Sequence, residues 1–151
     1  MPSPSEVSRW MREEHLRVVE VVARMGEQVA EVPRVNVEGW LKELREDFER
    51  FRAHLLKHFS LEEEGGYLEA VRQVQPSLHE AVQGLMHQHR EIGHLLTDIF
   101  HDVSQIQADM PLRIRDACCR IRNVLEILQQ HEDSENRLVS QVFTRDMGTH
   151  D

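Results

Sequence analysis

The chain has 151 residues, 40% of them hydrophobic and 30% charged, which suits one globular domain over residues 1–151 and excludes a disordered chain or a membrane protein. Its formal net charge of -9 at pH 7 disfavours nucleic acid or an anionic membrane as partner, because such binding relies on lysine and arginine patches. No apolar run reaches the ~20 residues that span a bilayer, and residues 1–8 lack the features of a signal peptide, so a cytoplasmic location is expected.

Proline and glycine residues divide the chain into four long segments rich in helix-forming residues. We predict helices over about residues 5–31, 36–64, 77–107 and 111–145. Asn36 and Ser77 are expected N-caps, because their side-chain oxygens can accept amide hydrogens of the first turn, and Pro111 suits a first helical turn. A short helix over residues 67–75 is expected between the second and third long segments.

Apolar residues recur in each segment at alternating steps of three and four, which places them on one helical face. Four such segments predict an all-α, antiparallel up-down-up-down four-helix bundle. A few polar residues occupy core-facing positions at the same spacing. They are His15, His58, Glu62, His89, His131 and Glu135.

Two pairs, His58/Glu62 and His131/Glu135, each place an imidazole and a carboxylate four residues apart on one helical face. A buried carboxylate without a partner loses hydration worth several kcal/mol, so a cation, a proton or exposure to solvent must compensate. Taken singly, each residue has an ordinary alternative as a hydrogen-bonded core histidine or a solvated glutamate. The combination favours a metal site.

The connections between segments place the histidines at one height in the bundle. His89 and His131 each lie about 20 residues from the turn near Asp109, or ~30 Å along a helix, so they are expected to face each other. A similar count around the first connection brings His15 near the level of His58. Four histidines are therefore expected to meet in one layer.

Histidine and carboxylate ligands without thiolate suit iron, manganese or zinc, and six ligands exceed the four of a structural zinc site. We therefore predict two metal ions, with Glu62 and Glu135 as bridging ligands and with water or hydroxide completing the coordination. Two irons are preferred, and manganese or zinc are the alternatives.

These residues and motifs resemble the hemerythrin-like (HHE cation-binding) domains over essentially the whole chain. The resemblance rests on His15 and on the stretches HFSLEEE, HQHREI and QHEDSE, which carry the other five residues. Ferritin-like bundles use Glu-x-x-His pairs three apart, so they fit less well. The resemblance implies a non-haem di-iron centre that binds or senses O2, senses iron or redox state, or handles nitric oxide and peroxide.

One position departs from the oxygen-carrying members of that family, which have two histidines four apart on the third helix. Here Gly93 stands four residues after His89, and His94 stands five after, turned away. Gly93 is therefore expected to line an open metal position with room for water or substrate, which favours chemistry over reversible oxygen carriage.

His54, Glu63 and Tyr67 are candidates to contact the ligands without binding metal themselves. The remaining histidines are expected on solvated faces: His79, His87, His94, His101 and His150. Cys118 and Cys119 are adjacent on one predicted helix, where a mutual disulfide would be strained, so both are expected to be reduced packing residues, with a redox role as the alternative.

Three classes of function fit this sequence. The first is a binding or sensing module for O2, nitric oxide, iron or redox state; the second is a di-iron peroxidase, oxidase or nitric-oxide-handling enzyme. The third is a metal-free helical module that binds a protein partner, which the sequence does not identify. A small-molecule ligand at an iron site is preferred.

Overall fold

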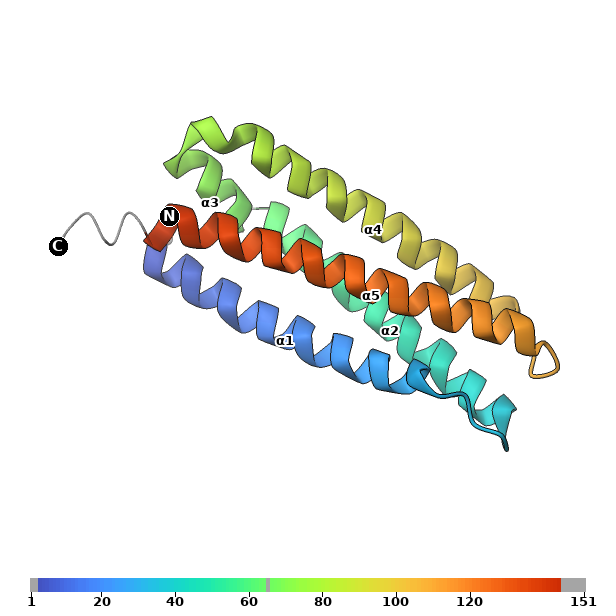
Figure 1. Ribbon diagram of the computed structural model, residues 1–151. Helices are drawn as coiled ribbons and strands as arrows, with labels where there is room; N and C mark the ends of the chain where they lie inside the picture. Colours follow the sequence, from blue (N-terminus) through green and yellow to red (C-terminus); the bar gives the residue numbers. More distant parts are fainter. Residues whose placement is uncertain (1–2, 65, 145–151) are drawn as a thin grey trace.

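The computed structural model describes residues 3–64 and 66–144. Within these residues, four long helices lie side by side in alternating directions (Figure 1): α1 (Pro4–Ala30), α2 (Val37–Glu63), α4 (His79–Gln105) and α5 (Pro111–Val139). No strand occurs in the described part of the chain. The predicted all-α, up-down-up-down four-helix bundle is therefore confirmed.

The connection from α2 to α4 is the elaborate one. It contains the short helix α3 (Tyr67–Val74) and a 3-10 turn at Pro76–Leu78, and it lies at the end of the bundle where α1 begins (Figure 1). The short helix expected over residues 67–75 is present. After α5 the chain continues as a π-helical turn at Ser140–Thr144. Residue 145, where the last helix was expected to end, lies outside the described residues.

The helix starts agree only in part with the expected caps. Asn36 does precede α2, but its φ is 56° and its side chain forms no capping hydrogen bond. The expectation for Ser77 is wrong: it lies inside the 3-10 turn, and α4 begins two residues later at His79. The turn that begins at Pro76 leads directly into α4, so no side-chain cap is used there. Pro111 occupies the first turn of α5 as predicted.

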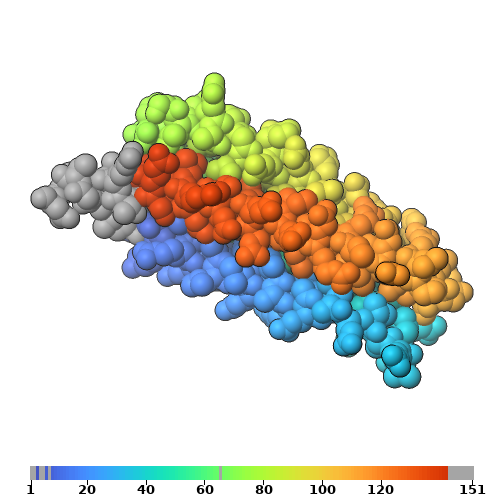
Figure 2. Space-filling model, viewed as in Figure 1, coloured from blue at the N-terminus to red at the C-terminus, as the bar shows by residue number. Residues whose placement is uncertain are grey.

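The core consists of two apolar clusters along the bundle. The larger cluster includes Phe48, Leu55 and Ile121, and the smaller one, near α3, includes Leu68 and Val82. α5 packs against α1 and α4, and α2 packs against the same two helices. Figure 2 shows α5 covering the bundle between α1 and α4 on the viewed face.

Both cysteines are free, as expected, and Cys118 is buried in the larger cluster. The expectation that Cys119 is a packing residue is wrong, because Cys119 is exposed on the outer side of its helix. Burial raises the pKa of the Cys118 thiol. Within the described residues, no helix has the length and apolarity required to cross a membrane.

Candidate metal centre

A layer of buried polar side chains separates the two apolar clusters. All four long helices contribute to it, and each member exposes 6% of its surface or less. Its seven members, called the polar layer below, are His15, His58, Glu62, His89, His131, Glu132 and Glu135. The sequence places apolar core residues one turn away on both sides, such as Met11 and Val18 around His15. The layer is thus held by the same helical periodicity that forms the core.

The structure brings all six sequence-predicted ligand residues into this layer. Together with Glu132, they form two groups of four residues that share one member, and within each group the donor atoms lie within 4.8 Å of one another. One group is His15, His58, Glu132 and Glu135, and the other is Glu62, His89, His131 and Glu135. Only Glu135 belongs to both groups, so it is the residue best placed to bridge two cations.

The two His-x-x-x-Glu pairs converge as their spacing predicts. On α5, His131 Nε2 lies 2.5 Å from Glu135 Oε1, and on α2, His58 Nε2 lies 3.3 Å from Glu62 Oε1. His89 reaches both carboxylates from α4, with its Nε2 at 2.8 Å from Glu135 Oε1 and 3.2 Å from Glu62 Oε1. The imidazoles therefore all direct Nε2 toward the carboxylates.

Glu132 is the member that the sequence reasoning missed. Its Oε2 lies 2.9 Å from His15 Nε2, and its Oε1 lies 3.5 Å from His58 Nε2. A signal was present in the sequence, because Glu132 falls at seven-residue spacing between the buried residues Leu125 and Val139. A helix in a bundle buries three positions per heptad, and Glu132 occupies the third.

Buried polar atoms without a hydrogen-bond partner are concentrated in this layer. Among the described residues there are six such side-chain atoms, and five belong to the layer: His58 Nε2, His131 Nε2, Glu62 Oε1 and both oxygens of Glu132. Buried polar groups are normally satisfied, so unsatisfied donors and acceptors that face one another indicate a missing partner. Imidazole nitrogens and carboxylate oxygens suit iron, manganese or zinc, so the residues fit a metal centre.

Without metal, protons supply the compensating charge. Burial by itself lowers the pKa of His15, but close contacts with the carboxylates of Glu132, Glu135 and Glu62 outweigh it and raise the pKa to about 12. Burial likewise opposes protonation of His89, yet its carboxylate partners raise its pKa to about 10. The pKa of Glu135 is well below its usual value, because the histidine contacts outweigh the effect of burial. In the metal-free protein, the carboxylates of the layer thus favour the protonated form of His15 and His89.

Tyr67, at the start of α3, extends its hydroxyl into the layer. The hydroxyl contacts Oε2 of both Glu62 and Glu135 and lies 3.5 Å from His15 Nε2. Burial, together with the charges of the two glutamates, raises the pKa of the phenol well above its usual value. Glu63 also touches a layer residue, with its Oε2 at 3.0 Å from His89 Nδ1. Tyr67 and Glu63 are both among the residues expected from the sequence to contact the metal-binding side chains.

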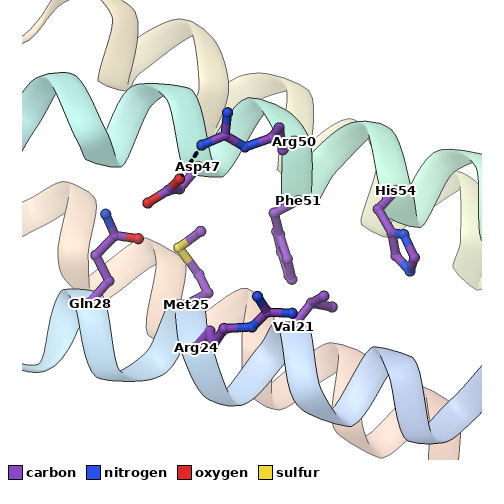
Figure 3. Close-up of a pocket in the computed structure, with 8 residues that line it drawn as sticks. All are labelled: Val21, Arg24, Met25, Gln28, Asp47, Arg50, Phe51 and His54. Atoms are coloured by element: carbon purple, nitrogen blue, oxygen red, sulfur yellow. Dashed lines mark hydrogen bonds and ion pairs between the residues drawn. The ribbon is translucent and has the colours of Figure 1, made fainter.

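His54 lies elsewhere. It forms no hydrogen bond, ion pair or ring contact with the layer and instead lines a groove between α1 and α2 together with Arg24 and Phe51 (Figure 3). Asp47 and Arg50 form an ion pair of 2.5 Å on the same groove. The structure does not bring His54 to the ligands, because a residue four before His58 is displaced by a full turn along α2.

Gly93 lies beside α2. A Cβ at this position would be 3.3 Å from Leu56 Cδ2, so the space expected next to the glycine contains the Leu56 side chain. Gly93 allows close approach of α4 and α2 here, and its role as lining of an open metal position stays a prediction. His79, His87, His94 and His101 are exposed, in agreement with the sequence analysis, and His150 lies outside the described residues.

A protein-family model described as "Hemerythrin HHE cation binding domain" matches residues 6–142 of the chain, a range that includes every residue of the polar layer. No curated protein and no solved structure matches the chain.

Proposed function

Because this chain belongs to the hemerythrin HHE cation-binding domain family, we propose that its polar layer holds two iron ions and binds or senses a small molecule such as O2 or nitric oxide. The observation that carries the proposal is the pair of four-residue donor groups that share Glu135. Each group offers two imidazoles and two carboxylates, a set suited to iron with room for further ligands. Manganese or zinc would use the same residues.

In this proposal, His15, His58 and Glu132 hold one ion, Glu62, His89 and His131 hold the other, and Glu135 bridges them. Iron there would supply reversible binding of O2 or nitric oxide and one-electron chemistry. The chain's own residues supply the fixed geometry, since every imidazole Nε2 already faces a carboxylate. Metal ions would also take the place of the protons that the carboxylates favour on His15, His58 and His89 in the metal-free protein.

The surroundings of the layer favour a small, uncharged ligand. Apolar clusters lie on both sides, and Phe59 stacks on His89 with ring centroids 4.2 Å apart. Such walls exclude bulk water and disfavour charged or large molecules. Two surface grooves reach the edge of the layer, one lined by His15 and the other by His131, and these are the routes that a diatomic molecule would use.

Peroxide turnover is a second candidate, and Tyr67 is the observation that favours it. Its hydroxyl is buried between the carboxylates of Glu62 and Glu135. A phenol in that position can donate a hydrogen bond or a proton to an oxygen species at the site. A site that only stores metal would have no use for such a donor.

The test is to add O2 or nitric oxide to the iron-loaded, reduced protein and to follow the visible spectrum. Binding is expected to give new absorption bands that saturate with ligand in the wild type and in H87Q, whose exposed histidine lies on the same helix as His89. The bands should be lost in H89Q. No spectral response of the loaded wild-type protein to either gas would reject the binding function, and oxygen evolution from added peroxide would favour the enzymatic one.

A further inference from the structure

Each histidine of the polar layer uses its second ring nitrogen, Nδ1, for a contact with a neighbouring helix. The acceptor is a carboxylate oxygen for two of them and an amide oxygen for the other two. The four contacts are His15 to Asn136 at 2.7 Å, His58 to Glu14 at 3.3 Å, His89 to Glu63 at 3.0 Å and His131 to Gln88 at 2.7 Å.

The four contacts form a closed ring around the bundle. Glu14 of α1 reaches α2, Glu63 of α2 reaches α4, Gln88 of α4 reaches α5, and Asn136 of α5 returns to α1. Each of these residues is the immediate chain neighbour of a layer residue. A one-residue step along a helix turns the side chain by about 100°, away from the layer's centre and toward the next helix. The ring is therefore a consequence of the same helix orientation that builds the layer.

The two carboxylate acceptors of this ring are divided equally between the two donor groups. Each donor group contains one histidine whose Nδ1 faces a carboxylate and one whose Nδ1 faces an amide: His58 and His15 in the first, His89 and His131 in the second. An oxygen acceptor at Nδ1 fixes the proton there and leaves the Nε2 lone pair facing the layer. A carboxylate acceptor does more, because its negative charge makes the imidazole a stronger donor to a cation.

We propose that Glu14 and Glu63 are positioning residues that each strengthen one histidine ligand per metal position, while Asn136 and Gln88 only fix ring orientation. The inference rests on the proposed metal function. Glu14 exposes 12% of its side chain and Glu63 exposes 29%, so solvent screens their charges only in part. Arg17 contacts Glu14 on its solvent side and holds the carboxylate in place.

Substitutions that exchange charge for amide at constant shape separate the electronic role from a structural one. E14Q and E63Q keep an oxygen acceptor but remove the charge, whereas N136D and Q88E add a charge at the other two positions. E91Q is the matched control, since Glu91 accepts from His87 at 2.7 Å on the surface, with both side chains 62% exposed. The affinity for Fe(II) is measured under argon by competition with a chromophoric chelator, together with the reduction potential of the loaded protein.

E14Q and E63Q should each weaken Fe(II) binding about 10-fold and raise the reduction potential, because outer hydrogen-bond partners of metal ligands typically contribute 10- to 100-fold in affinity. N136D and Q88E should bind as tightly as the wild type or more tightly and lower the potential, and E91Q should change neither. Equal weakening in all four ring variants would mean a purely structural role and would overturn the proposal.

The proposed role of Glu14 and Glu63 would also be overturned if the wild type binds two irons and E14Q and E63Q keep its affinity and reduction potential. That result would leave the metal function intact. Failure of the wild type to bind iron would reject both. Helical circular dichroism of each metal-free variant verifies that it is folded, and the charge-adding variants give a separate test if a charge-removing variant unfolds.

Discussion

Replacing Glu135 by glutamine removes a charge shared by three histidines while keeping the volume of the side chain. The Nε2 atoms of His131, His89 and His15 lie 2.5, 2.8 and 3.2 Å from its oxygens, and Glu135 is fully buried. Removing one partner of a buried ion pair costs about 3 to 5 kcal/mol. Because other carboxylates face the same histidines, we expect E135Q to lower the free energy of unfolding of the metal-free protein by ~3 kcal/mol.

The assay is urea unfolding at pH 7, followed by helical circular dichroism after metal removal. E91Q is the control, because the His87–Glu91 pair has a similar distance of 2.7 Å but lies on the surface. An exposed pair contributes only about 0 to 1 kcal/mol. If E135Q and E91Q change the free energy of unfolding equally, the reasoning is refuted, since burial would then have no influence on these pairs.

Three further predictions follow from the same geometry. The pKa values of His15 and His89, raised to about 12 and about 10 in the folded metal-free protein, exceed the unfolded value of 6.5. Their stabilising contribution is therefore complete below pH 6.5 and declines as the pH rises above it, up to about pH 12 for His15 and about pH 10 for His89. The urea midpoint of the metal-free protein should therefore be lower at pH 9 than at pH 6, and a higher midpoint at pH 9 would contradict this. G93A should keep the iron content and gain up to ~1 kcal/mol of stability, because the alanine favours the helix and Leu56 can shift by a few tenths of an ångström; loss of iron on analysis would show instead that Gly93 lines the metal position. Y67F should keep the iron content but slow peroxide consumption, measured as oxygen evolution, and an unchanged rate would exclude the phenol as donor.

The bundle could be predicted from the sequence because apolar spacing reports which helical face is buried, and every long helix carries that spacing. Helix ends were less predictable. Ser77 has the side chain of an N-cap, but the 3-10 turn that begins at Pro76 carries the chain into α4 without one. Asn36 is correctly placed before α2, yet its left-handed backbone leaves its side chain without a capping hydrogen bond. Such details depend on how the connection is folded, which local residue preferences do not determine.

The polar layer was predictable to the extent that its members repeat at core spacing. Glu132 was missed because only two core positions per heptad were considered, although α5 buries three. Core spacing does not identify Glu14, Gln88 and Asn136, because each of them contacts a histidine of another helix. Their roles depend on the rotation of one helix relative to the next. The sequence indicates these residues only by their position, since each is the chain neighbour of a predicted metal-binding residue.

The same limit applies to Gly93 and His54, whose surroundings depend on the neighbouring helix and which the sequence alone does not place. A glycine in a helix leaves space only if the neighbouring helix does not fill it, and Leu56 of α2 fills the space at Gly93. His54 shares a helical face with His58, but the layer is only one turn deep, so His54 lies in the groove between α1 and α2.

The iron content of the protein after anaerobic loading with Fe(II) and desalting tests the central claim most directly. The two donor groups predict about two irons per chain in the wild type and in E91Q, and fewer in E135Q, which lacks the charge of the one residue common to both groups. A wild-type protein without stoichiometric iron, or an E135Q variant with the same iron content as the wild type, would contradict the account.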